Sequence, residues 1–180
     1  YRAWEPWPTS SSPSRHDTLE RMTTNGENAY ELFKAAIGKD EGAGEWMVID
    51  QDRINAFADA TDDHQFIHVD PEACAQMSPW GVPIAHGFLT LSLLTPLCGS
   101  LTQDPKLLEG IVMGVNYGFE KVRFINPVKV NSNIRASSVV SAVELKDPNT
   151  LQVTRIVTVE IEGETKPALV ADWITRIVYS

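Results

Sequence analysis

The chain has 180 residues, of which 15 are basic and 24 acidic, so its formal net charge at pH 7 is −9. This length suits one domain, and a hydrophobic content of 43% argues against disorder over most of the chain. Without a clustered cationic face, an acidic protein is a poor partner for nucleic acid or an anionic membrane, so we expect a soluble, cytoplasmic globular protein that binds neither.

Residues 1–21 differ in composition from the rest of the chain. They contain three prolines and four serines and show no hydrophobic periodicity. A secretory signal would need an apolar stretch of about 7–15 residues, which this segment lacks. We expect a loose leader over 1–21 and one domain over 22–180, although Trp4 and Trp7 could also pack on that domain.

Short helices and one short strand are predicted next. Thr24 and Glu27 have the spacing of a capping box before an apolar helical face, and Gly38 follows as a stop signal. Residues 45–49 have the composition of a short strand. Asp50 can cap a second helix. The inner face of that helix comprises Ile54, Phe57 and Ala58.

Two further helices are predicted before the middle of the chain. Asp70 and Pro71 have the types expected at the N-cap and first turn of a helix that extends to about Met77. Residues 87–95 are apolar nearly all round, which predicts a helix buried on most sides. The longer apolar stretch 87–101 is too short and too interrupted to cross about 30 Å of hydrocarbon.

The two cysteines do not form a recognisable framework. Cys74 and Cys98 are too few for a disulfide scaffold and lack the spacing of a zinc site. We expect two buried thiols in a reducing compartment.

The second half of the chain changes its hydrophobic period from helical to alternating. In the last segment, for example, Asp172 and Arg176 alternate with apolar residues, as in a strand with one face in water. The predicted strands are 111–124, 130–145, 151–162 and 168–179. These elements predict an α+β fold in which one antiparallel sheet packs a hydrophobic helix against one face.

Residues 61–70 hold the densest set of titratable side chains, between two predicted helices. Asp63 and His68 are five residues apart, and a tight loop can direct both toward one point. A carboxylate and an imidazole that share a water could deprotonate it and return a proton. The alternative is structural: Asp63 caps the loop, and His68 is a buried histidine with satisfied hydrogen bonds.

A second feature is the His-Gly step at residues 86–87. A glycine entering an apolar helix leaves backbone N–H groups free to meet a carbonyl or oxyanion. The alternative is that Gly87 serves packing alone, by letting the helix approach the sheet.

Together these segments carry a resemblance to a known family. Residues 62–75 and 81–94 resemble the hydratase motif of MaoC-like proteins, and the His-Gln-aromatic-Ile-His-Val-Asp string resembles the NodN-like branch. Residues 116–135 and 166–177 also resemble that branch, so the resemblance covers about 30–178. It implies a hot-dog fold, in which a curved antiparallel sheet wraps a long central helix, and it implies a homodimer.

The resemblance also implies an activity. In the (R)-specific enoyl-CoA hydratases of this family, the motif Asp and His hold the water that adds to a trans-2-enoyl thioester. By position, Asp63 would be the general base and acid, His68 its partner, and Gly87 the donor of an N–H to the thioester oxygen. Thr95 holds the place of a hydroxyl that helps in some members. The implied partner is an acyl-CoA or acyl carrier protein thioester, with no metal and no cofactor.

Several residues near the motif have less specific roles. Gln65 and Phe66 stand where many members have Asn-Pro, which leaves the acyl-chain preference open. Phe66 and Trp80 could line an acyl tunnel, or pack in the core. His64 is expected to be a neighbouring loop residue, and Asp62 a helix-end or solvent carboxylate.

Two basic residues offer a further binding prediction. Lys121 and Arg123 lie on a predicted strand and could anchor coenzyme A phosphates on an otherwise acidic protein. They could equally form an ordinary solvated strand face.

Two other functions compete with hydration. A hot-dog thioesterase would act on the same substrates, but it usually places a carboxylate on the long helix, and 87–101 contains none. A binding or assembly module that kept the fold without turnover is the second alternative, and the presence of Asp63, His68 and Gly87 argues against it.

Overall fold

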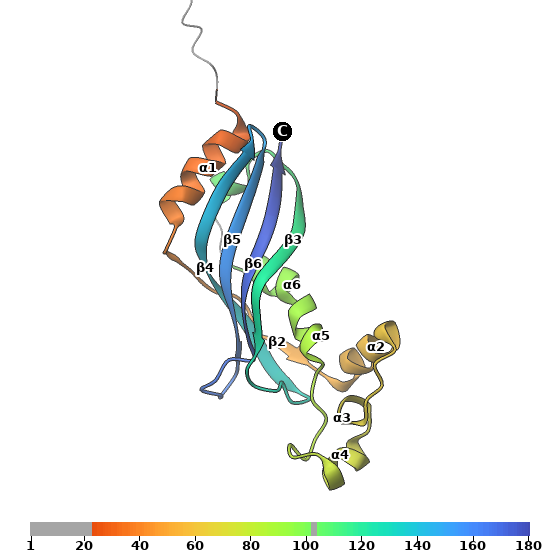
Figure 1. Ribbon diagram of the computed structural model, residues 1–180. Coiled ribbons are helices and arrows are strands. Elements are labelled where there is room, and N and C mark those ends of the chain that lie inside the picture. The colour runs from red at the N-terminus through yellow and green to blue at the C-terminus, as the bar shows by residue number, and fades with distance from the viewer. Residues whose placement is uncertain (1–22, 102–103) are drawn as a thin grey trace, which may run out of the picture.

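The computed structural model describes residues 23–101 and 104–180, so the expected leader lies outside the described residues (Figure 1). A single antiparallel sheet dominates, with the strand order β1-β4-β5-β6-β3 and with β2 also paired to β4. The strands are β1 Asp40–Ala43, β2 Met47–Ile49, β3 Ile111–Phe124, β4 Ser132–Asp147, β5 Thr150–Ile161 and β6 Leu169–Tyr179. The helices are α1 Asn25–Ala36, α2 Gln51–Thr61, α3 Phe66–Val69, α4 Pro71–Met77, α5 Gly87–Ser92, α6 Leu94–Gly99 and α7 Pro105–Leu108.

All four predicted long strands are present, and burial alternates along much of β4, β5 and β6, whereas β3 is exposed along nearly its whole length. Along β5 every second side chain from Leu151 to Ile161 is buried, and those between are half-buried or exposed. The predicted α+β class is therefore confirmed. The sequence analysis missed β1, α3 and α7, which are four residues each and too short to show a period.

The predicted helix caps are present. Thr24 accepts a hydrogen bond from the Glu27 N–H, and the Glu27 side chain accepts one from Thr24, which completes the capping box. Asp50 and Asp70 accept the N–H groups of Arg53 and Ala73. These local signals decide where α1, α2 and α4 begin.

The central helix packs on the concave face of the sheet, but it is not continuous. It is divided into α5 and α6 at Leu93. Pro96 explains the break, because its nitrogen carries no hydrogen for the carbonyl of Ser92 and its ring crowds that carbonyl. The expectation of burial on most sides is also wrong in part, since Phe88 is 68% exposed.

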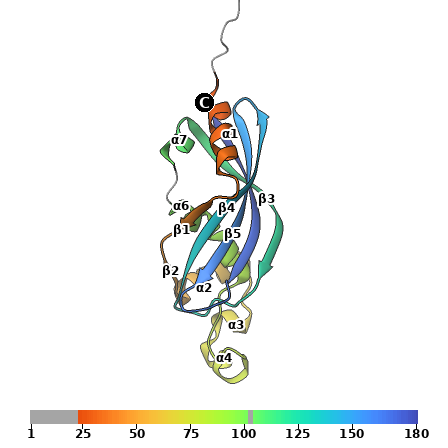
Figure 2. The same ribbon diagram turned by 90° about the vertical axis from the view of Figure 1, so that its left-hand side faces the viewer.

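Two apolar clusters hold the helices on the sheet. The larger joins α5 and α6 to the inner faces of β4, β5 and β6, and the smaller joins α1 and α7 to the opposite end of the same strands. Helices α2, α3 and α4 form an extension, and both views place α3 and α4 beyond one end of the sheet (Figures 1 and 2). Within the two described ranges, no helix is long and apolar enough to cross a bilayer.

Strand β3 forms one edge of the sheet. Many of its large apolar side chains are exposed, with Val112 at 63% and Tyr117 at 54%. A long apolar edge strand is a ready template for pairing with another chain. The exposed β3 edge is therefore a candidate surface for pairing with another chain.

Candidate active site

Asp63 is held where α2 ends. Asp62 adopts a left-handed conformation (φ 57°), which aspartate tolerates better than most residues, and so turns the chain. The Asp63 N–H then donates to the Ala58 carbonyl at 3.2 Å. The Asp63 side chain is exposed, and the turn projects it from the end of a fixed helix. This agrees with the helix-end role expected for Asp62.

His68 lies on α3 and is only 7% exposed. Its Nδ1 lies 2.6 Å from the carbonyl oxygen of Ile84. Because a carbonyl can only accept, Nδ1 carries the hydrogen, and the lone pair of the neutral ring is on Nε2. Burial lowers the pKa of His68 below 6.5, and the Ile84 hydrogen bond opposes this shift. His68 is thus neutral at pH 7 and offers a proton acceptor.

The carbonyl that orients His68 is itself held on both sides. The N–H of Ile84 donates to Ile67, and the next N–H, that of Ala85, donates to Val128. The backbone of His68 is also held, because the Gln51 side chain donates a hydrogen bond to the carbonyl of His68 at 2.8 Å. This support fixes the ring orientation with no contribution from substrate.

His86 is a site residue that the sequence analysis missed. Its Nε2 lies 2.9 Å from the backbone carbonyl of Asp63, to which it donates, and its ring stacks on His68 with centroids 3.7 Å apart. It is 2% exposed, and its Nδ1 has no partner within the described chain. His86 therefore ties the Asp63 turn to the start of α5. Its position before Gly87 was visible in the sequence, but a lone His-Gly step does not signal this contact.

Asp63, His68 and His86 each place a ligand atom within 4.8 Å of the others. A metal bound to an imidazole lies in the ring plane about 2.0–2.1 Å from the nitrogen. The two ring planes are inclined by only 26° in a stacked pair, so they do not converge that close to both rings. The cluster suits a shared water, which accepts and donates hydrogen bonds with looser geometry, better than a metal ion.

Gly87 begins α5, so its N–H has no partner within the helix. It borders a hollow of about 220 Å³ that also reaches His68, Thr90 and the ring of Phe124. His68 and Gly87 thus line one concave surface. Thr90, which is buried, adds a hydroxyl that the sequence analysis did not single out.

The other predicted substrate contacts lie elsewhere. Thr95 is on α6 and borders two further hollows on the same side of the sheet. Phe66 and Trp80 are half-buried, and neither lines the hollow at Gly87. His64 points away from the cluster, since its Nε2 pairs with Asp59 at 2.8 Å.

The two basic strand residues are exposed. Lys121 pairs with Asp172 at 3.2 Å, and Arg123 donates to the carbonyl of Val122. They alternate along β3 with Val122 and Phe124, so they point to the face opposite the hollow at Gly87. An anchor for coenzyme A phosphates at these residues stays a prediction.

Comparisons with known proteins agree with this architecture. Residues 32–162 match the family described as MaoC like domain. The chain is 50% identical over 143 residues to nodulation protein N of Rhizobium leguminosarum bv. viciae, covering 79% of this chain and 87% of that protein. It is 47% identical over 144 residues to 3-hydroxyacyl-thioester dehydratase Z of Mycobacterium tuberculosis, covering 80% and 92% of the two chains.

A solved structure supports the fold. The (R)-hydratase from A. caviae involved in PHA biosynthesis superposes with a TM-score of 0.58 at 22% identity, covering 77% of this chain and 94% of that chain. At 22% identity, the match supports a shared fold and nothing further. The predicted hot-dog fold is confirmed, with its central helix divided into α5 and α6.

Proposed function

We propose that this chain, which belongs to the MaoC-like dehydratase family, is a hydro-lyase that adds water to a trans-2-enoyl thioester to give an (R)-3-hydroxyacyl thioester, and catalyses the reverse. One observation carries the proposal: a carboxylate and the lone pair of a neutral histidine converge beside a free helix N–H. The dehydratase relative, with 47% identity, supports a 3-hydroxyacyl thioester as the substrate class.

The two acceptors orient a single water. The Asp63 carboxylate and the Nε2 of His68 each accept one of its hydrogens, which leaves an oxygen lone pair free to attack C3. As the C3–O bond forms and an O–H bond breaks, Asp63 takes the proton. Asp63 then returns it to C2 on the same face, so the addition is syn and the acid–base pair is regenerated.

The Gly87 N–H supplies the electrophilic half of the reaction. Attack at C3 moves electrons through C2 to the thioester oxygen, where an enolate develops. An amide that already points at that position stabilises the charge without reorganising, an effect worth about 10²–10³-fold per donor in enzymes that transfer acyl groups. His86 acts through position, because it fixes the Asp63 turn against the start of α5.

The test is an assay of purified protein with trans-2-enoyl-CoA substrates of increasing chain length. Loss of the enoyl absorbance with no free thiol supports hydration. Release of thiol indicates a thioesterase, and neither change indicates a binding module. Asp63→Asn and His68→Ala should each lower kcat at least about 100-fold, with effects far from additive.

The chain offers matched controls beside both residues. Asp62→Asn keeps a residue that tolerates the left-handed conformation, and His64→Ala removes an imidazole directed at Asp59. Both variants should keep kcat within a few-fold of the parent. Equal losses in the controls and in the Asp63 and His68 variants would refute the assignment.

We also propose that the protein acts as a homodimer in which the β3 edges of two copies meet. The edge strand is self-complementary in an antiparallel pair, which is the contact a two-fold axis generates. Pairing there would remove the exposed apolar edge of the sheet, including Val112 and Tyr117.

A further inference from the structure

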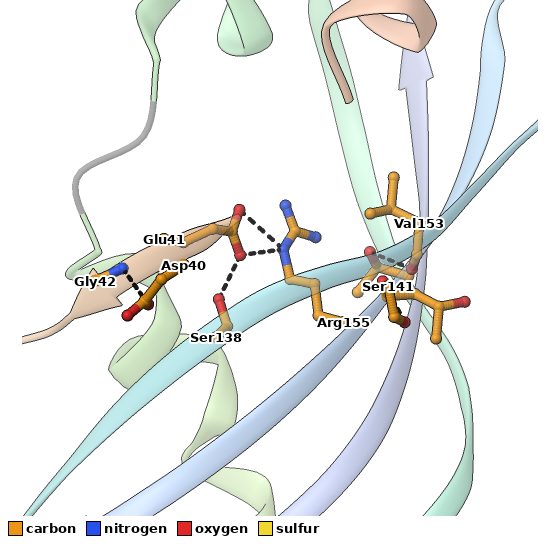
Figure 3. A network of polar contacts seen from close by, with 9 residues as sticks. Asp40, Glu41, Gly42, Ser138, Ser141, Val153 and Arg155 are labelled. Atoms are coloured by element: carbon orange, nitrogen blue, oxygen red, sulfur yellow. Dashed lines mark hydrogen bonds and ion pairs between the residues drawn. The ribbon is translucent and has the colours of Figure 1, made fainter. Parts of the chain in front are cut away.

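Five polar or charged residues are buried within the described part of the chain, and one of them differs from the rest. They are His68, His86, Thr90, Ser138 and Arg155. Both histidines bond to backbone carbonyls. Figure 3 shows that Arg155 Nε donates to both carboxylate oxygens of Glu41, at 3.0 and 3.4 Å, and that the Ser138 hydroxyl donates to the same carboxylate. Within residues 23–101 and 104–180, the side chain of Thr90 has no hydrogen-bond partner.

The Thr90 hydroxyl also differs from other hydroxyls on the helices of this protein. A serine or threonine inside a helix commonly donates to a carbonyl three or four residues before it. Thr61 on α2 does so at 2.7 Å, and Ser92, on the same helix as Thr90, does so at 2.8 Å. The carbonyl four residues before Thr90, that of His86, receives the Thr90 backbone N–H instead, at 3.2 Å. The Thr90 hydroxyl is therefore left to bond a group outside its own helix.

The Thr90 hydroxyl keeps accessible surface although the residue is only 3% exposed. The unpaired side-chain atoms that are sealed from solvent in the described chain are Nδ1 of His86 and Nε1 of Trp173, and Oγ1 of Thr90 is not among them. The space that Thr90 borders is the hollow of about 220 Å³ that His68 and Gly87 also line. The hydroxyl therefore opens into the proposed active site.

Helix geometry places the Thr90 side chain beside the Gly87 amide. Residues three apart lie on one face of a helix, and helical side chains lean toward the N-terminus. Thr90 follows Gly87 by three residues, an advance of about 4.5 Å along the axis, so its side chain lies over the first turn of α5. A hydroxyl at this place and the Gly87 N–H can reach one ligand oxygen from two sides.

The proposed reaction supplies an oxygen that can use two donors. A carbonyl oxygen has two lone pairs, and the Gly87 N–H occupies one of them. When water adds at C3, the thioester oxygen gains the negative charge of an enolate, so a second donor binds the transition state more strongly than the substrate. The walls of the hollow are mainly apolar, with Ile84, Phe124 and Val128 among them. In such surroundings a hydrogen bond is stronger than in water.

We propose that the Thr90 hydroxyl is a second hydrogen-bond donor to the thioester oxygen, beside the Gly87 N–H. The inference rests on the proposed hydratase function, since it adds a donor to that same site. It departs from the family resemblance, which gives a hydroxyl role to Thr95. Thr95 is exposed on α6, and the two hollows that it borders share no lining residue with the hollow at Gly87.

Thr90→Val removes the hydroxyl with little change in shape, since both side chains are branched at Cβ. For trans-2-enoyl-CoA hydration, kcat should fall about 100-fold, the loss expected of one donor to an oxyanion, and KM should change little. Tm should not fall, because the variant removes an unpaired polar group from a mainly apolar site. An unchanged kcat would overturn the inference, and a large fall in Tm would assign the hydroxyl to structure instead.

Three further variants show whether the loss belongs to this hydroxyl. Thr90→Ser keeps a hydroxyl at the same place and should retain most of kcat. Ser92→Ala is the matched control and should keep kcat, because it removes a hydroxyl of the same helix that bonds a backbone carbonyl outside this hollow. Thr95→Val tests the role that the resemblance implies. A loss in Thr95→Val with none in Thr90→Val, or an equal loss in Ser92→Ala, would overturn the inference.

Binding of acetoacetyl-CoA separates this inference from the proposed function. This ligand has no C2=C3 bond to hydrate, but it loses a proton from C2 to solvent and forms an enolate whose charge lies partly on the thioester oxygen. The ultraviolet absorbance of the enolate gives the pKa of the bound ligand. Wild type should lower this pKa below that of the free ligand, and Thr90→Val should raise it again by about 1–2, equivalent to about 10- to 100-fold.

The two readouts fail separately. A higher pKa of acetoacetyl-CoA bound to Thr90→Val supports the second donor even if no enoyl-CoA is hydrated. Equal pKa values for the ligand bound to wild type and to Thr90→Val overturn the inference even if hydration is found. If kcat falls in Thr90→Val while the two pKa values are equal, the hydroxyl acts on the attacking water and the assignment to the thioester oxygen is wrong.

Discussion

Gly87→Ala tests the catalytic role proposed for this glycine against a packing role. A Cβ at Gly87 would lie 3.0 Å from Cδ1 of Phe124 and 3.1 Å from Cε1 and Cγ of the same ring. The ring is 49% exposed and can move outward, and Gly87 has no positive φ that alanine would strain. Overpacking costs about 1–3 kcal/mol, of which alanine recovers up to about 1 kcal/mol through its helix propensity.

The free energy of unfolding should therefore change little, and the activity much. Because the ring can move outward, we expect the low end of the overpacking cost, about 1 kcal/mol. At about 2–4 °C per kcal/mol for a domain of this size, Tm should then fall by about 4 °C at most. The added methyl group intrudes between the amide and the thioester oxygen, and we expect kcat/KM to fall about 100-fold, close to the loss of one oxyanion donor.

A double-mutant cycle with Phe124→Leu decides between two causes of that loss. If the displaced ring blocks the hollow, the shorter side chain makes room and Gly87→Ala costs little in that background. If the methyl itself meets the substrate, the cost stays about 100-fold in both backgrounds. Enoyl-CoA hydration and thermal melting are measured on the same preparations. Full rescue by Phe124→Leu, or wild-type kcat/KM in Gly87→Ala, would refute the role given to the amide.

Three further predictions concern stability and assembly. The pKa of His68 in the folded protein lies below 6.5, so the unfolded chain binds this proton first as pH falls. The free energy of unfolding, measured by urea titration, should therefore decrease as pH drops below 6.5. His68→Gln should reduce this pH dependence, and an unchanged dependence of the unfolding free energy on pH would contradict the prediction. Val112→Lys at the β3 edge should give monomers in sedimentation experiments. The control Ile156→Lys changes an exposed residue on the interior strand β5 and should remain dimeric. A monomeric wild type would exclude the proposed dimer. Arg155→Met should lower the free energy of unfolding by about 3 kcal/mol, because it leaves the Glu41 carboxylate without its ion-pair partner. Adding Glu41→Leu should recover most of that loss in the same titrations. A double variant as unstable as Arg155→Met would show that the unpaired charge is not the cause.

Much of the fold could be predicted because its signals are local. Strands β4 to β6 are long enough to show an alternating pattern. Thr24, Asp50 and Asp70 mark helix starts through contacts three residues away. The break at Leu93 was also within reach, since Pro96 cannot complete the helical hydrogen bond to Ser92.

In the candidate site, too, the residues in local motifs could be predicted, and the residue that acts through a distant contact could not. Asp63, His68 and Gly87 stand in sequence motifs, and the structure brings the first two together and places the third beside His68. The part played by His86 was hidden, because its partner is a backbone carbonyl 23 residues away. Side-chain identity gives no sign of a bond to a distant main-chain atom.

The sequence by itself determined the types of the longer elements, the helix caps and the candidate pair of Asp63 and His68, because these depend on residue type and on spacings of a few positions. The tertiary structure alone decided which nitrogen of His68 is the acceptor, through the Ile84 carbonyl 16 residues on. It alone placed Arg155 and Trp173 opposite each other on neighbouring strands. Strand register sets such neighbours, and register follows from how the whole sheet packs against its helices, which no local pattern encodes.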